Sequence, residues 1–138
     1  LGAKEVIPRE EVDDQTGKPM LSSRWAGVVE TVGGNTLSTA IRSTKMHGAV
    51  CCLGNVRNDI ISTSVYPFIL RGVYLIGIDS AEKRMELRLV IWNKITNEWR
   101  IDNIDRVVKE VPLDGLNDEI DTILEGGQTG KVLVNLWK

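Results

Sequence analysis

The sequence holds little histidine and cysteine, and these shortages exclude several kinds of site. Among its 138 residues are one histidine and two cysteines. His47 has no acidic or cysteine partner at a metal-ligand spacing and no partner for a Ser-His-Asp mechanism, so we expect neither chemistry. Cys51 and Cys52 are adjacent, and because neighbouring strand residues point to opposite faces, a disulfide between them would be badly strained. We expect a buried, reduced pair.

A clustered basic face and a long apolar run are also missing. Net charge is −2 with acidic and basic residues interspersed, unlike a protein that binds nucleic acid. No apolar run approaches the roughly 20 residues that span a bilayer, and no secretory leader opens the chain. The sequence predicts a cytoplasmic protein with no nucleic-acid or membrane partner. Paired carboxylates such as Asp13 and Asp14 lie in polar stretches, and we expect them to be solvated.

Apolar segments that end at glycine predict strands and helices in alternation. The expected strands are 4–9, 25–32, 49–53, 73–78, 106–111 and 130–136. The expected helices run from N-cap Asn35 to Gly48, over 82–99, and from Pro112 to Gly126. Such alternation favours parallel strands joined by helical crossovers, hence an α/β fold.

The expected helix over 82–99 carries an apolar stripe. Met85, Leu89, Trp92 and Ile95 fall on one face, with charged residues beside them. This amphipathic pattern is more typical of a core or an interface than of a ligand site.

The stretch VYPFILRGVYLIGIDS, residues 65–80, is the most informative part of the chain. Its apolar strand stops at Gly77 and small polar residues, as a buried parallel strand does. Ligands bind in such sheets just outside the carboxyl ends of the strands. Glycine-ended turns allow a phosphate-bearing or planar ligand to approach the backbone, although glycine also simply ends strands.

In order and spacing, five segments resemble the quinone oxidoreductase group of the medium-chain dehydrogenase/reductase superfamily, which includes NADPH-dependent acrylyl-CoA reductases. They are LGAKEVIPRE, RWAGVVETVGG, the strand that ends at Gly54, VYPFILRG with GIDS, and GKVLV. The sequence has no internal repeat, low-complexity tract or obvious linker, so we expect one compact unit over 1–138. By the resemblance, about 1–105 would be a partial Rossmann-like parallel sheet, the second half of a nucleotide-binding domain. About 106–138 would be the carboxyl-terminal helix and strand of the catalytic domain.

The resemblance also implies NADPH as the cofactor and places five residues near it. Arg9 would pair with the 2′-phosphate that distinguishes NADPH from NADH, or it is a surface arginine that ends a strand. Asn55 would lie beside the cofactor, and Ile69 would pack near it or belong to the core. Ser80 would lie near the nicotinamide, which Gly127 or the residue after it would approach again. No catalytic residue is identified, because in the group the residues that polarise substrate lie mostly outside the matched segments.

The amino-terminal half of the group is not in this sequence: it has no GroES-like barrel and no GxGxxG turn, the turn that holds the pyrophosphate. Residues 4–9 correspond to the third strand of the nucleotide-binding domain, and the first two strands normally lie between the third and the rest. The first strand would then slide across, pair with another chain, or rely on a separate first half. We expect a homo-oligomer with exposed strand edges or a swapped element.

The leading interpretation is the carboxyl-terminal part of an NADPH-dependent oxidoreductase that reduces a conjugated carbonyl of the quinone, enoyl or acrylyl-CoA type. The alternative is a truncated, non-catalytic relative that is stable as an oligomer and binds a partner or a nucleotide. The chain opens with Leu-Gly-Ala rather than methionine, and what lies upstream of Leu1 would discriminate between the two. A complete enzyme of unrelated mechanism would need a nucleophile and base that the sequence does not offer.

Overall fold

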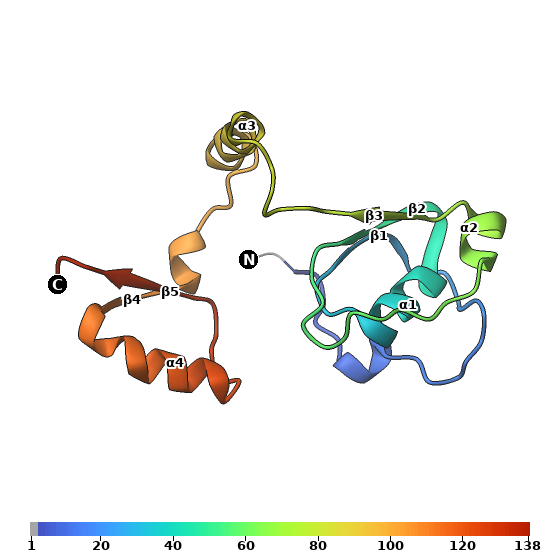
Figure 1. Cartoon of the computed structure of the whole chain (residues 1–138), viewed down its shortest axis with the longest axis horizontal. Helices are drawn as coiled ribbons and strands as arrows, with labels where there is room; N and C mark the ends of the chain where they lie inside the picture. The colour runs from blue at the N-terminus through green and yellow to red at the C-terminus, as the bar shows by residue number, and fades with distance from the viewer. Residues whose placement is uncertain (1–2) are drawn as a thin grey trace. The chain divides into compact units, whose positions relative to one another are not determined.

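The computed structural model describes residues 3–138 (Figure 1). Their contacts group into two compact units, Lys4–Leu87 and Arg88–Lys138, with the boundary inside helix α3 (Met85–Thr96). The assignment of about 1–105 and 106–138 to two parent domains stays a prediction.

The larger unit is built on a three-stranded parallel sheet in the order β1-β2-β3. Its strands are β1 (Trp25–Glu30), β2 (Thr44–Cys52) and β3 (Tyr74–Gly77). Helix α1 (Gly34–Ser43) connects β1 to β2, and a long loop with helix α2 (Tyr66–Arg71) connects β2 to β3. This is the expected α/β pattern of strands joined by crossovers, and it confirms the Rossmann-like fold class.

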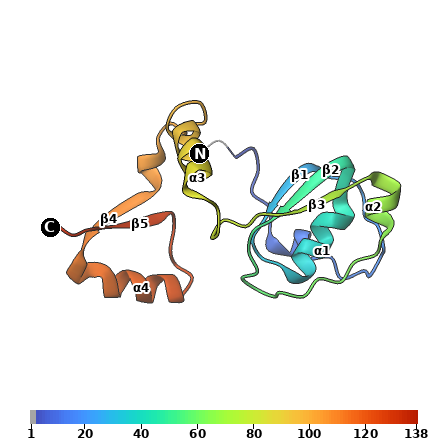
Figure 2. The same cartoon turned by 45° about the horizontal axis from the view of Figure 1, so that its top comes forward.

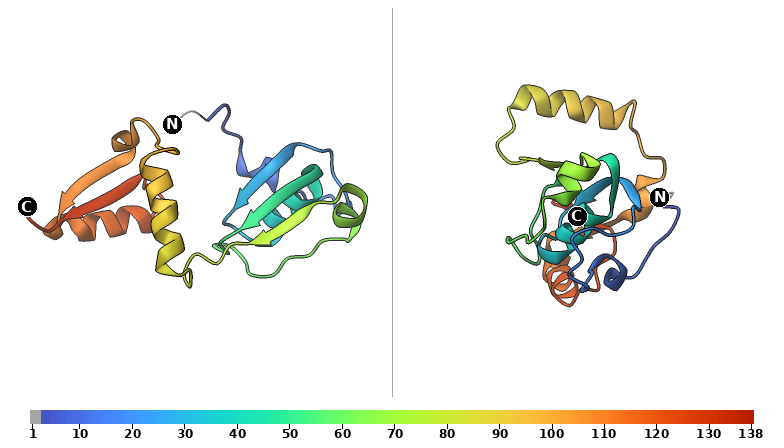
Figure 3. Two further views of the ribbon diagram at one scale, coloured as in Figure 1. Left: turned by 90° about the horizontal axis from the view of Figure 1, so that it is seen from above. Right: turned by 90° about the vertical axis from the view of Figure 1, so that its right-hand side faces the viewer.

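Helix α1 covers one face of this sheet (Figures 2 and 3). Its Leu37, Ala40 and Ile41 pack against Val50 and Val73, and all five are buried. Val28, Cys52 and Phe68 pack around this core and are partly buried. The core therefore lies between one helix and one sheet face.

The opposite face of the sheet is open. Successive strand residues point to opposite faces, so Val29, Cys51 and Ile76, which the register places side by side, point away from α1. Val29 is 76% exposed and Ile76 42%. Parallel sheets are normally covered on both faces, so this unit leaves apolar strand surface uncovered.

A buried arginine fixes the loop before β1 to α1. Arg42 is 5% exposed, and each of its five N–H groups has an acceptor. Two of them bond Asp14, one its carboxylate at 2.9 Å, and one bonds the Lys18 carbonyl at 2.8 Å. The other two bond Ser38 and Thr39 within α1. The guanidinium thus links the loop to the helix with no donor left for a ligand.

A second arginine, Arg71, links α2 to segments far away in the chain. Arg71 donates to the carbonyls of Arg42 and Thr44 at the end of α1 and to the Leu21 carbonyl at 2.6 Å. Gly72 then caps α2 in the left-handed region, where a side chain would meet the ring of His47. The Arg71 side chain, bonded to carbonyls of distant segments, therefore helps to position the start of β3.

The smaller unit contains a β-α-β motif. Strands β4 (Val108–Pro112) and β5 (Lys131–Asn135) pair in parallel and are joined by α4 (Leu116–Leu124), as Figure 2 shows. Val111 is buried, and so is Glu119 of α4, which forms an ion pair with Lys109. The final helix and strand are thus close to the expected ranges.

Three expectations about local structure are wrong. Residues 4–8 form no strand, because no neighbouring strand pairs with them, and Pro8 leads into a 3₁₀ turn at Arg9–Val12. The helix after β1 begins at Gly34 rather than Asn35, and it ends at Ser43, well before Gly48. There the Thr44 hydroxyl bonds the Ala40 carbonyl while the Thr44 backbone is already extended and paired with β1.

The apolar stripe of α3 is also not part of a core. No residue of α3 is buried, and Met85, Leu89 and Trp92 are each about 60% exposed. The helix is apolar around most of its circumference rather than on one stripe, since Val90 and Ile91 are also on its surface. Its role as an interface stays a prediction.

Replacing Gly54 by alanine should destabilise the larger unit. A Cβ there would lie 2.7 Å from the backbone oxygen of Thr31, so the strand ends would have to separate. We expect the free energy of unfolding to fall by about 1–3 kcal/mol in urea denaturation. Gly77→Ala is the matched control, because a Cβ there meets nothing within 4 Å. Equal effects of the two substitutions would contradict the close approach.

Candidate functional site

The three parallel strands of the larger unit end at one edge of the sheet. Residues 31–33 follow β1, residues 53–55 follow β2, and residues 78–80 follow β3. The Leu53 amide donates to the Glu30 carbonyl at 3.0 Å, and the Ile78 amide donates to the Cys52 carbonyl at 2.9 Å. These bonds hold the three strand ends in register beyond the strands themselves. This edge is the position at which doubly wound sheets bind ligands.

A buried carboxylate fixes the turn after β1. Glu30 is 4% exposed and accepts hydrogen bonds from the Val32 amide at 2.8 Å and the Gly33 amide at 3.0 Å. Gly33 has φ +77° and lies against the Asn58 backbone, so only glycine suits this position. Both amides are satisfied within the chain. The turn therefore does not offer them to a phosphate.

The structure brings two of the five predicted site residues to the same edge. Asn55 follows β2 and Ser80 follows β3, and both are exposed. Ile69 lies in α2, which precedes the amino end of β3, and it is 67% exposed, so the alternative that it belongs to the core is wrong.

The other two predicted residues lie elsewhere. Arg9 begins the 3₁₀ turn, exposed, with no ion pair among the described residues. Gly127 lies in the smaller unit, where its amide bonds the Thr122 carbonyl beyond the end of α4.

The sequence did not indicate a polar network around Asp13. The expectation that Asp13 and Asp14 are solvated is wrong, since their side chains are 15% and 17% exposed. Asp13 pairs with Arg57 at 2.7 Å and accepts from the Asn35 amide group at 2.6 Å. Arg57 lies in the segment after β2. The network therefore connects the loop before β1, the first turn of α1 and the edge of the sheet at which the strands end, here called the ligand edge. The only available signal was the alternation of acidic and basic residues, which does not specify partners 44 residues apart.

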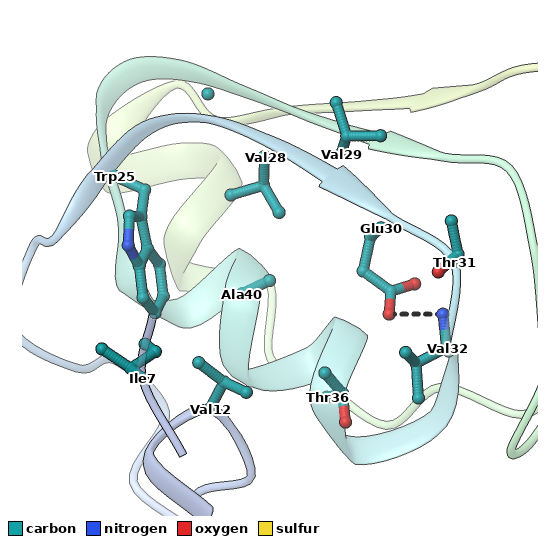
Figure 4. Close-up of a pocket in the computed structure, with 11 residues that line it drawn as sticks. Ile7, Val12, Trp25, Val28, Val29, Glu30, Thr31, Val32, Thr36 and Ala40 are labelled. Atoms are coloured by element: carbon teal, nitrogen blue, oxygen red, sulfur yellow. Dashed lines mark hydrogen bonds between the residues drawn. The ribbon is translucent and has the colours of Figure 1, made fainter. Parts of the chain in front are cut away.

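A groove runs beside the outer edge of β1 (Figure 4). Its volume is about 380 Å³, and most of its lining is apolar. Ile7 and Val12 form one wall, β1 forms the other, and Thr36 and Ala40 of α1 contribute from the helix. Sequence patterns did not predict this groove, because it is formed by segments far apart in the chain.

The described residues contain neither a membrane-spanning helix nor a cluster of metal ligands. In residues 3–138, no helix has the length and apolar character needed to cross a membrane. Over the same range, no group of three or more His, Cys, Asp or Glu side chains is placed to hold a metal ion.

No family model matches the sequence. Over 137 residues, 99% of this chain, it is 36% identical to YhfP of Bacillus subtilis (strain 168), which is assigned to the quinone oxidoreductases. Over 136 residues it is 32% identical to acrylyl-CoA reductase AcuI of Ruegeria pomeroyi. The matches cover 42% and 41% of these proteins, so the chain spans about two fifths of the length of the curated relatives it matches.

Two solved structures share the fold. The crystal structure of B. subtilis YhfP with NAD bound aligns with a TM-score of 0.90, covering 98% of this chain and 41% of that one at 36% identity. Escherichia coli K-12 YhdH with bound NADPH aligns with a TM-score of 0.85, covering 96% of this chain and 41% of that one at 29% identity.

The parallel sheet with its ligand edge is that of a partial Rossmann-like domain. The similarity in sequence and fold confirms the resemblance predicted above. This chain corresponds to part of a medium-chain dehydrogenase/reductase of the quinone oxidoreductase and acrylyl-CoA reductase group.

Acid should loosen the network around Asp13 and Asp14. The hydrogen bond from Arg57 holds the pKa of Asp13 below its usual 3.8. Burial acts to raise the pKa of Asp14, but hydrogen bonds from Thr16 and the Arg42 guanidinium outweigh it, and that pKa is lowered too. A lowered folded-state pKa gives stability that is complete above the unfolded value and is lost as pH falls through the folded value. We therefore expect the unfolding free energy to fall below about pH 4.

The variant Asp13→Asn should show a weaker dependence of the unfolding free energy on pH over that range. The matched control is Asp59→Asn, since Asp59 is exposed and has no ion pair among the described residues. Chemical denaturation followed at several pH values from 3 to 7 measures both. An Asp13→Asn profile parallel to that of the parent would contradict the assignment.

Proposed function

We propose that this chain supplies one side of an NADPH site and belongs to an oxidoreductase that reduces a conjugated carbonyl of the quinone, enoyl or acrylyl-CoA type. The observation that carries the proposal is the 36% identity and TM-score of 0.90 to a protein solved with NAD bound. E. coli YhdH, solved with NADPH, supports the choice of the phosphorylated cofactor. Because the chain spans two fifths of these relatives, activity is a proposal for the whole protein rather than for this segment.

The residues at the ligand edge suit one end of a dinucleotide better than its middle. Gly77 has open space around it, and Asn55 and Ser80 are exposed there with hydrogen-bonding side chains. A sugar or a planar ring can therefore approach the ends of β2 and β3. Glu30 occupies the amides of the turn after β1, so the described residues at that turn give the pyrophosphate no free pair of amides. This agrees with the absence of a GxGxxG turn from the sequence.

In this proposal the residues of the chain bind and orient. Asn55 and Ser80 would hold polar groups of the cofactor at the sheet edge, and the guanidinium of Arg9 would recognise the 2′-phosphate. When bound, the cofactor supplies the hydride, while the protein sets its orientation. None of these side chains takes part in bond making.

A second candidate function is that of a non-catalytic relative that forms a homo-oligomer. The open sheet face with Val29 and Ile76 favours it, because exposed apolar strand surface is typical of interfaces. Sedimentation over a wide range of concentration tests this candidate, and a monomer throughout would contradict it.

Calorimetric titration of the folded chain with NADPH and with NADH tests the leading proposal. We expect micromolar binding of NADPH and weaker binding of NADH, since only NADPH has the phosphate that Arg9 would pair with. Arg9→Ala should remove the difference between the two cofactors, and Ser80→Ala should weaken both. Arg84→Ala, another exposed arginine, is the matched control and should change neither. Failure of the folded chain to bind either cofactor would contradict the proposed half-site.

A further inference from the structure

The loop after β2, residues 54–58, carries Asn55 but has no helix or strand of its own to hold it. The side chains of Asn55, Val56 and Arg57 are all exposed. An irregular, exposed loop does not fix the direction of a side chain by itself, since loops are the more mobile parts of a fold. The position of Asn55 therefore depends on what the backbone of this loop contacts.

The turn after β1, residues 31–33, makes that contact. Two carbonyls of the turn accept hydrogen bonds from amides of the loop, and the shorter bond joins the Val32 carbonyl to the Arg57 amide at 2.9 Å. A Cβ on Gly33 would lie 3.3 Å from Cα of Asn55, so the two backbones are in direct contact. The position of Asn55 therefore follows the shape of this turn.

One buried side chain holds the turn in its shape, as Figure 4 shows for Glu30 and Val32. Oε1 of Glu30 accepts from the Val32 amide at 2.8 Å, and both carboxylate oxygens accept from the Gly33 amide at 3.0 Å. Gly33 and Gly34 both have positive φ, and glycines adopt many other conformations when nothing restrains them. The carboxylate thus selects one shape of a turn that is flexible by composition.

The charge of Glu30 has no other described task. Within residues 3–138 it takes part in no ion pair. A buried charge is costly unless it is paired or hydrogen-bonded, so the Val32 and Gly33 amides are what stabilise it here. Hydrogen bonds to an ionised acceptor are roughly twice as strong as neutral ones. The carboxylate and the turn therefore hold each other firmly.

We propose that Glu30 is the residue that positions Asn55 for the cofactor. Its carboxylate fixes the Val32 and Gly33 amides, and the fixed turn in turn holds the loop that carries Asn55. Glu30 is a positioning residue and does not contact the cofactor itself. The inference rests on the proposed function, in which Asn55 holds a polar group of NADPH.

Backbone order in the free chain gives the first test, through ¹⁵N relaxation. Glu30→Gln keeps the size of the side chain, removes its charge and replaces one acceptor oxygen by an NH₂ group. We expect the order parameter of Asn55 to fall from about 0.85 to below about 0.6, while that of Val50 in the core of β2 stays near about 0.85. Unchanged order at Asn55, or an equal fall at Val50, would overturn the proposal.

NADPH affinity gives the second test, by calorimetric titration of the folded chain. Glu30→Gln should raise the Kd about tenfold, because the turn loses charge-assisted hydrogen bonds. In an Asn55→Ala background the same substitution should change the Kd no further, since Glu30 acts through Asn55. A merely structural role would leave the two effects additive, and additive effects would overturn the proposal.

The matched control is Glu119→Gln. Glu119 is likewise a buried carboxylate, but it lies in the smaller unit, where it pairs with Lys109. Its substitution should leave the order of Asn55 unchanged. A fall at Asn55 equal to that in Glu30→Gln would overturn the proposal.

Two measurements decide the matter if circular dichroism shows that Glu30→Gln does not fold. In the parent chain, Val32 and Gly33 should be as ordered as the core, and low order there would overturn the proposal. Val56→Pro removes the amide that bonds the Thr31 carbonyl, at an exposed position. It should lower the order of Asn55, and an unchanged Asn55 would contradict the link between turn and loop.

The two tests separate this inference from the proposed function. Loss of order at Asn55 in Glu30→Gln, in a chain whose parent binds no NADPH, would retain the positioning and reject the half-site. NADPH binding that Glu30→Gln leaves unchanged would retain the half-site and reject the positioning.

Discussion

The backbone pairing of β2, with β1 on one side and β3 on the other, is the interaction on which the larger unit depends. Through it α1 gains a surface of three strands on which to bury Leu37 and Ile41, since one or two strands alone are marginal in water. The same pairing brings three strand ends to one edge, and Asn55 and Ser80 both lie in the segments that follow these ends. Both outer strands depend on this one central strand, and each keeps one unpaired side in the described part of the chain.

Much of this could be predicted from the sequence, for physical reasons. Continuous apolar runs that stop at glycine gave β1, β2 and β3 to within a few residues, except that β2 begins five residues earlier than expected. The early start follows from pairing with Trp25, a partner that lies far back in the chain. Residues 4–9 have the composition of a strand, but a strand exists only where a neighbour pairs with it. The sequence pattern within residues 4–9 does not show whether a neighbouring strand is present.

The candidate site was less accessible to prediction. The carboxyl ends of the strands were located correctly, because parallel topology brings them together whatever the details. The pairing of Asp13 with Arg57 and the saturation of Arg42 depend on side chains that meet only after folding. The groove beside β1 arises from residues 7–12, the strand and α1 together. Features of this kind arise only when segments far apart in the chain meet on folding.

Arg71 has a consequence for how the chain folds. Its guanidinium bonds the Leu21 carbonyl, 50 residues away, and also the carbonyls that end α1. Both contacts are non-local, since they join α2 to segments that lie 27 to 50 residues earlier in the chain. Parallel pairing imposes a similar delay, because each strand meets its neighbour only after a crossover, and non-local contacts slow folding. The larger unit should therefore fold more slowly than a helical chain of its size, whose contacts are mostly local.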